Sequence, residues 1–212
     1  MKALNKLLFA GGASAALSVS SIAAAVADVP GFVERGEAWT HTASSCAVNP
    51  GDSDKAAFTG PDLTFRPEAY SAGIEVTPIL GGTQFGPIWQ PIVAYCNVLN
   101  PLDADPAAQT PSWDALIVGY LDPDGVGINT NVVARLIRVR RNDGVASTVA
   151  TFDSNKFNTR AHGEQLALFS EPMDFRHNEY FVELELIRTP LAGHSNPVVY
   201  SVRLVDVNFT PK

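Results

Sequence analysis

Two glutamates on one side of an alternating segment are the residues best suited to hydrolytic chemistry. Glu183 and Glu185 stand between the apolar residues of 180–187, so a strand there turns both carboxyl groups to the same, polar face. Carboxyl groups two residues apart on one strand face lie about 6 to 7 Å from each other, a spacing within the range that glycosidases use. Any polar strand face has this spacing, so it does not by itself indicate a hydrolase.

A strip of arginines offers these glutamates ordinary partners. Its members are Arg135, Arg138, Arg140 and Arg141. Pairing of this strip with Glu183 and Glu185 across strands is common surface electrostatics, and it competes with a hydrolytic role. If the arginines were unpaired, they would suit an anionic sugar or a phosphate.

Signals for nucleophilic or metal-dependent catalysis are absent from the sequence. No G-x-S-x-G occurs, and the Gly-His-Ser-Asn cluster at 193–196 has the composition of a loop. The histidines form no H-x-H or HExxH pattern; they are His41, His162, His177 and His194. His162 and His177 each precede a glutamate by two residues, but both pairs fall at strand entrances, where exposed polar residues are ordinary. No catalytic residue is predicted, and the sequence favours a non-enzymatic protein.

Loop aspartates are the candidates for a structural calcium ion. Asp122 and Asp124 are spaced by one residue in Asp-Pro-Asp-Gly, and calcium prefers such hard oxygen ligands on loops. The later ligands of an EF-hand loop are missing, and aspartate also forms turns by accepting hydrogen bonds from its own backbone. A calcium ion at Asp122 and Asp124 and simple turn formation are both open, and no other cofactor is expected.

Trp89 and Trp113 are candidates for ligand binding. A flat aromatic ring on an exposed surface can stack against a sugar ring, as in sugar-binding sandwiches. Trp89 lies in Gly-Pro-Ile-Trp-Gln-Pro and Trp113 follows Pro-Ser, both at strand entrances, where a ring can equally cap the core.

Short alternating segments separated by turn residues predict the elements that position these side chains. The strand candidates are 62–65, 74–80, 92–99, 115–121, 132–139, 148–152, 165–169, 180–187 and 198–207. An Asp-Gly pair at 143–144 predicts a hairpin between two of them, and frequent prolines exclude long helices. The expected fold class is all-β: an antiparallel β-sandwich of jelly-roll type with about nine short strands, with a closed barrel as the alternative.

The first 27 residues have the order of a secretory signal peptide. Lys2 and Lys6 precede an apolar, small-residue stretch that ends in Ala-Val-Ala at 25–27, a typical cleavage site. A retained membrane anchor is the alternative, but glycine and serine interrupt the stretch. We expect a signal peptide at 1–27, an extended irregular segment at 28–60 and the sandwich domain at 61–212. The mature protein is expected to be secreted or periplasmic, in a bacterium.

The two cysteines are expected to pair in such an oxidising compartment. No CxxC motif points to a redox or metal site, so Cys46 and Cys96 are interpreted as a structural disulfide. The closed loop of about fifty residues would stabilise the fold by roughly 4 kcal/mol on the chain-entropy argument.

The net charge of the chain argues against one class of binding partner. The formal net charge is -7, from 15 basic and 22 acidic residues, which argues against general nucleic-acid binding. No segment after residue 27 has the length and apolar content of a membrane span.

Three classes of function follow. The first is a non-enzymatic extracytoplasmic protein that acts through its surface, as a structural or adhesive subunit of an assembly with protein partners or copies of itself. The second is a carbohydrate-binding module for surface glycans, with calcium as an option. The third is an extracytoplasmic hydrolase built on the sandwich.

Overall fold

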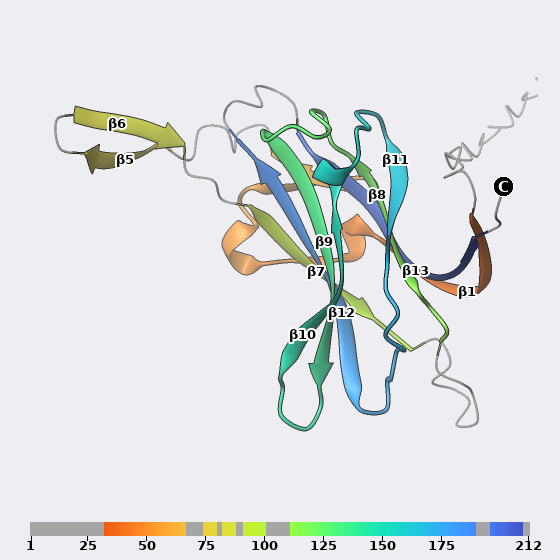
Figure 1. The fold of residues 1–212 in the computed structure, drawn as a ribbon. Helices are drawn as coiled ribbons and strands as arrows, with labels where there is room; N and C mark the ends of the chain where they lie inside the picture. Colours follow the sequence, from red (N-terminus) through yellow and green to blue (C-terminus); the bar gives the residue numbers. More distant parts are fainter. Residues whose placement is uncertain are drawn as a thin grey trace, which may run out of the picture.

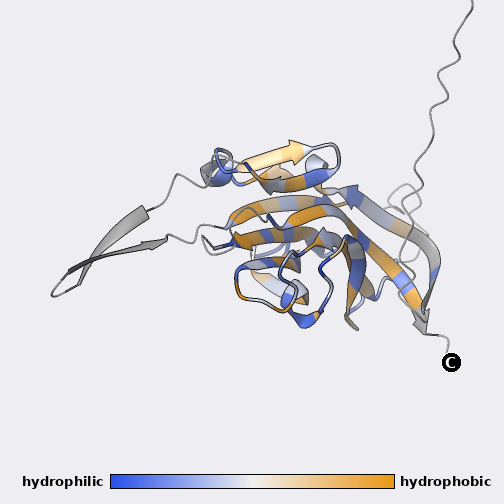
Figure 2. Ribbon diagram, turned by 90° about the horizontal axis from the view of Figure 1, so that it is seen from above, coloured by the Kyte–Doolittle hydropathy of each residue, from blue (hydrophilic) through white to orange (hydrophobic). Residues whose placement is uncertain are grey.

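A computed structural model describes residues 32–66, 74–79, 82–87, 91–100, 111–189 and 196–209. Two antiparallel sheets pack face to face, with a hydrophobic core between them (Figure 1). The fold is therefore an antiparallel β-sandwich, and the prediction from alternation and turn residues is confirmed. Figure 2 shows hydrophobic residues recurring along the strands of both layers.

The first sheet has the order β11-β8-β13-β4-β3, and β1 also pairs with β13. Its strands are β1 (Phe32–Thr42), β3 (Ala56–Thr59), β4 (Asp62–Phe65), β8 (Ala115–Leu121), β11 (Gly163–Leu168) and β13 (Val198–Phe209). β8 occupies one side of β13, while β4 and β1 share the other side, β4 at Val198 and Val199 and β1 at residues 201–209.

The second sheet has the order β10-β9-β12-β7-β2. Its strands are β2 (Ala47–Val48), β7 (Ile92–Val98), β9 (Thr130–Arg140), β10 (Ala146–Asp153) and β12 (Asn178–Arg188). β5 (Ile74–Ile79) and β6 (Gly82–Pro87) pair only with each other among the described strands.

The helices of the described residues are single 3-10 turns. They are η1 (Ala43–Ser45), η2 (Pro50–Asp52) and η4 (Ser154–Lys156). Within the described ranges, no helix has the length and apolar character needed to traverse a bilayer.

The core follows the alternation seen in the sequence. On β12 the side chains of Tyr180, Val182, Leu184 and Leu186 are buried, while the residues between them are only partly covered. β7 has the same pattern, with Ile92, Ala94, Cys96 and Val98 buried. The alternation therefore sets the core face of these two strands, and it leaves Phe181, Glu183 and Glu185 on the outer face of the second sheet.

The two predicted turns are present. Gly144 has φ 71° and closes the hairpin between β9 and β10 by donating its N–H to the Arg140 carbonyl at 2.9 Å. Gly125 has φ 64° and donates to the Asp122 carbonyl at 3.2 Å. Both glycines hold the left-handed conformation that other residues rarely adopt.

The N-terminal segment differs from the expectation of an irregular lead-in over 28–60. Its described part, from residue 32 on, contributes β1 and β3 to the first sheet and β2 to the second. The sequence lacks clear alternation here because the register of β1 shifts between Arg35 and Trp39, as at a β-bulge. β1 pairs its backbone with the long strand β13, and the sequence of β1 alone does not predict this pairing.

Candidate functional site

The outer face of the second sheet brings Glu183 and Glu185 to a single arginine. Nη1 of Arg135 on β9 lies 2.8 Å from Oε1 of Glu183, and Nη2 lies 2.7 Å from Oε2 of Glu185. Burial works against the charge of Arg135, but its hydrogen bonds to the two glutamates outweigh burial and raise its pKa. Both carboxylates are thus bound by one guanidinium, so this arrangement does not give a hydrolytic acid and base their separate environments.

The remaining arginines of the predicted strip are paired as well. Arg138 pairs with Glu171, Arg140 with Asp143 at 2.8 Å, and Arg141 with Glu179 at 2.9 Å. The predicted pairing with Glu183 and Glu185 is confirmed for Arg135, whereas the other three arginines pair with different acidic residues.

Two aromatic side chains lie beside this triad. Tyr95 on β7 and Phe181 on β12 have ring centroids 5.8 Å apart at an interplanar angle of 74°. Tyr95 is the cross-strand partner of Glu183, so the rings and the triad share one face. Both rings are half-buried. We call Tyr95, Phe181, Arg135, Glu183 and Glu185 the sheet-face site.

In the described part of the chain, the tryptophans do not form an exposed aromatic surface. Trp113 is 4 % exposed and packs edge-on against Phe175 at 6.3 Å. Trp39 is 7 % exposed and stacks on His41 at 5.1 Å. Trp89 lies outside the described residues. The ring of Trp113 therefore belongs to the core, the second of the two alternatives open from the sequence.

The histidines lie apart from one another. His41 Nδ1 is 2.6 Å from Oγ of Ser45, His162 lies beside the Tyr200 ring, and His177 Nδ1 is 2.7 Å from Oδ2 of Asp174. His194 falls outside the described residues. Across the ranges that the structure describes, no three His, Cys, Asp or Glu side chains gather as a metal site.

Asp122 and Asp124 meet in a polar cluster between the β8–β9 loop and η4. The hydroxyl of Thr130 contacts both carboxylates, 2.6 Å from Oδ1 of Asp122, and the Ser154 hydroxyl contacts Oδ2 of Asp122 at 2.5 Å. The N–H of Asn129 donates to Oδ2 of Asp124 at 2.7 Å. Each carboxylate oxygen of the pair thus lies within hydrogen-bond distance of a hydroxyl or a backbone N–H, as in aspartate turns. The oxygens also suit a hard cation, so calcium here stays a prediction.

The two carboxyls of this cluster titrate in opposite directions. Burial raises the pKa of Asp122, with a further rise from Asp124, although the hydroxyls of Ser154 and Thr130 lower it. Burial also opposes ionisation of Asp124, but hydrogen bonds from Thr130 and the Asn129 N–H lower its pKa overall. The folded protein therefore holds a proton on Asp122 more tightly than the unfolded chain does.

This difference predicts the pH dependence of Asp122→Asn. A group with a raised pKa contributes stability below its unfolded pKa and loses that contribution as pH rises through its folded value. As the pH rises above about 4, the unfolded pKa of an aspartate, we therefore expect the variant to gain unfolding free energy relative to the native protein. Urea unfolding of both proteins at several pH values measures the difference.

The same variant, Asp122→Asn, also tests whether the cluster binds calcium. If the cluster binds calcium, the ion raises the melting temperature of the native protein, and Asp122→Asn removes that response. A native melting temperature unchanged by calcium or by a chelator rules out the ion.

The pH prediction has its own contradicting outcome. If the difference in unfolding free energy between the native protein and Asp122→Asn stays constant with pH, the pKa of Asp122 is not raised.

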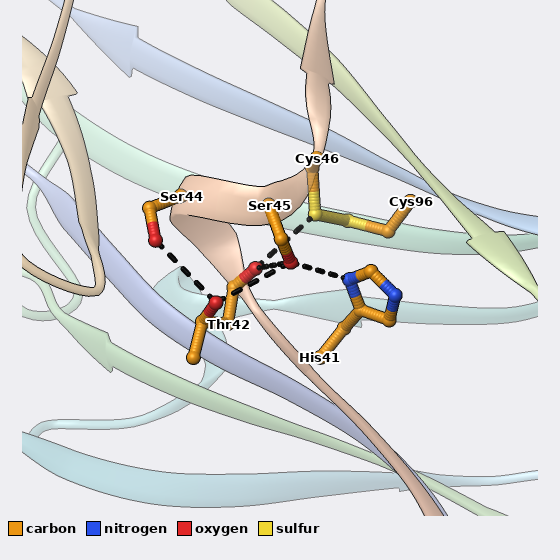
Figure 3. Close-up of a disulfide and its surroundings, with 6 residues drawn as sticks. All are labelled: His41, Thr42, Ser44, Ser45, Cys46 and Cys96. Carbon is orange, nitrogen blue, oxygen red and sulfur yellow. Dashed lines mark hydrogen bonds between the residues drawn. A yellow bond between two sulfur atoms is a disulfide. The ribbon is translucent and has the colours of Figure 1, made fainter.

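The predicted disulfide is present. Cys46 and Cys96 are bonded, with their Cα atoms 4.5 Å apart, and both side chains are buried. Figure 3 shows the hydroxyl groups of Thr42, Ser44 and Ser45 hydrogen-bonded to one another beside the sulfur atoms. The bond joins the segment between η1 and β2 to β7.

Comparison with known proteins gives only distant similarities. No protein-family profile and no curated protein matches the chain. Among solved structures, the low-affinity xylan-binding module CBM86 from Roseburia intestinalis aligns with a TM-score of 0.39 and 13% identity, over 81% of this chain and 97% of that one. The xylan-binding module CBM15 aligns with a TM-score of 0.38 and 11% identity, over 82% and 95%. At these scores the similarity carries no argument about what this chain binds.

Proposed function

We propose that this protein is a non-catalytic module that binds glycans on the outer face of its second sheet. The observation that carries the proposal is the Tyr95–Phe181 pair beside the Arg135–Glu183–Glu185 triad. The disulfide and the signal-peptide pattern of residues 1–27 support a place outside the cytoplasm, where glycans of cell surfaces and extracellular matter occur.

The chemistry of the sheet-face site suits a sugar chain. The apolar faces of sugar rings can pack on Tyr95 and Phe181, and the Tyr95 hydroxyl can exchange hydrogen bonds with sugar hydroxyls. The carboxylates of Glu183 and Glu185 accept hydrogen bonds, and the guanidinium of Arg135 donates them. The pairing of these three residues holds the polar groups in place before a ligand arrives.

Replacement of both aromatic residues tests the proposal. We expect Tyr95→Ala combined with Phe181→Ala to weaken glycan binding by about 2 kcal/mol or more, roughly thirtyfold in Kd. A glycan array of the native protein identifies a ligand, and calorimetry with that ligand measures the loss.

Phe58→Ala is the matched control for this experiment. Phe58 on β3 is 48 % exposed and belongs to the other sheet, so its loss removes an exposed aromatic ring outside the sheet-face site. The proposal fails if the native protein binds no glycan on the array. It also fails if Phe58→Ala weakens binding as much as the double variant.

A structural or adhesive subunit is the second candidate, because β10 leaves a strand edge unpaired. β10 has β9 as its only ladder partner among the described strands, and its eight residues, ASTVATFD, contain no lysine or proline. Such an edge can pair with another chain, although the register shift between Thr148 and Ala150 works against regular pairing.

The size of the protein in solution tests this candidate. Edge pairing predicts that the mean mass, measured by light scattering behind size exclusion, rises with protein concentration. Thr151→Lys on β10 should suppress the rise in mass, since charge on an edge strand opposes pairing. A monomer at all concentrations excludes self-assembly through β10.

A further inference from the structure

A pocket of about 350 Å³ lies at one end of the sandwich, where the β9–β10 hairpin turns and where the chain enters β12. In Figure 1 this end, with the hairpin that joins β9 to β10, is at the bottom. The end of β9 with its hairpin turn and the start of β12 with the turn before it each supply three lining residues: Arg140, Arg141 and Asn142, and Arg176, His177 and Asn178.

Backbone hydrogen bonds fix the two walls relative to each other. The N–H of Arg141 donates to the His177 carbonyl at 2.9 Å, which ties the hairpin to the turn. The Asp174 carboxylate accepts from the N–H groups of Arg176 at 3.0 Å and His177 at 3.3 Å, which shapes the turn itself. The backbone of the pocket is therefore held in place without a ligand.

Three arginines line this pocket. Arg140 binds Asp143 through Nη2 and Arg141 binds Glu179 through Nε, and both arginines are about half exposed. A guanidinium has five N–H groups, so each pair leaves donors for a ligand. The side chain of Arg176 is exposed and makes no ion pair within the described part of the chain.

His177 adds a further polar group. Its Nδ1 is held 2.7 Å from Oδ2 of Asp174. The carboxylate is a hydrogen-bond acceptor, so the proton of this contact lies on Nδ1, and Nε2 is the ring nitrogen left for a ligand.

We propose that this pocket binds an acidic sugar unit, with the arginines on its carboxylate or sulfate group. Guanidinium groups match the geometry of such oxyanions through paired N–H donors. The volume lies within the range of about 300–1,000 Å³ that small-ligand sites have, which is enough for a sugar ring as well as its charged group. Asn142 offers an amide to the sugar hydroxyls. The inference does not depend on the sheet-face site, which lies elsewhere on the second sheet.

Titration of the full chain, followed by NMR, tests the inference with three probes: glucuronate, inorganic sulfate and glucose. We expect glucuronate to shift the amide signals of 140–142 and 176–178 in a saturable manner, sulfate to shift them more weakly, and glucose to leave them unchanged. If glucuronate binds no more tightly than sulfate, the pocket recognises only the anion and the sugar part of the proposal is wrong. A response to glucose as large as that to glucuronate overturns the role of the charge.

Paired variants connect this response to the pocket. Arg176→Ala should weaken glucuronate binding by about tenfold or more, the usual effect of losing a charge-assisted hydrogen bond. Arg160→Ala removes the same charge at an exposed position outside the pocket and should have no such effect. Glu179→Gln should tighten binding, because it frees Arg141 from its partner. If Arg176→Ala and Arg160→Ala weaken glucuronate binding equally, the effect comes from net charge alone, and the proposal is overturned.

Discussion

Reduction of the Cys46–Cys96 disulfide is expected to lower the free energy of unfolding by about 4 kcal/mol. The bond closes a sequence separation of 50 residues, and its loss returns that loop entropy to the unfolded chain. Both side chains are buried, Cys96 in the middle of β7, so the bond lies within the core and not at a frayed end. Urea unfolding with and without reductant measures the change.

The double variant Cys46→Ala, Cys96→Ala is the control for this measurement. It should unfold at the urea concentration of the reduced native protein, and reductant should not change its transition. An unfolding midpoint that reductant leaves unchanged in the native protein would contradict the expected role of the bond. Such a result would mean that the sheets alone hold the segment that carries Cys46.

Replacement of Phe152 by alanine is expected to cost about 3–5 kcal/mol of unfolding free energy. Phe152 on β10 is 1 % exposed, and its ring lies 5.1 Å from that of Tyr120 and 5.6 Å from that of Phe157. Both neighbours lose contacts when the ring is removed. The cavity that remains has rigid strands on several sides and can close only in part.

Phe181→Ala is the matched comparison, because it removes the same ring from the outer face of β12. We expect it to cost much less unfolding free energy than Phe152→Ala and to act on ligand binding instead. Thermal or urea unfolding of the two variants side by side measures the difference. Equal losses of stability would show that the Phe181 ring packs as a core residue, and the sheet-face site would lose one of its two aromatic rings.

The central strands were predictable because their sequences alternate, as in β12, or form a short apolar run, as in β8. The structure places β4 and β8 at the residues expected, and β12 extends the expected segment 180–187 by two residues before and one after. The Asp-Gly hairpin was predictable from its need for a positive φ at Gly144. The strands β1, β2, β3 and β6 were missed. β1 depends on pairing with residues 201–209, far along the chain, and such pairing leaves no local pattern.

The candidate site was only partly predictable. Phe181 stands among glutamates on the polar face of an alternating segment, and this position is a sequence signal for an aromatic residue outside the core. The sequence contains no comparable signal at Trp113, whose ring is buried in the core. Tyr95 follows from the same alternation around Cys96. The arginine pocket could not be predicted, because the contact between Arg141 and His177 depends on how two turns meet in three dimensions.

The antiparallel pairing of β1 with β13 also has a mechanical consequence. Phe32 is the partner of Phe209, so the start of the described chain lies beside its end. A force that pulls these two ends apart opens the ladder from that end, one pair of hydrogen bonds after another, instead of shearing all of them together. The opening reaches Thr42 and then meets the covalent link at Cys46, which is bonded to a strand of the other sheet. Under tension the first strand is therefore expected to peel away as a short extensible tether, and the disulfide transfers the load to β7 of the second sheet.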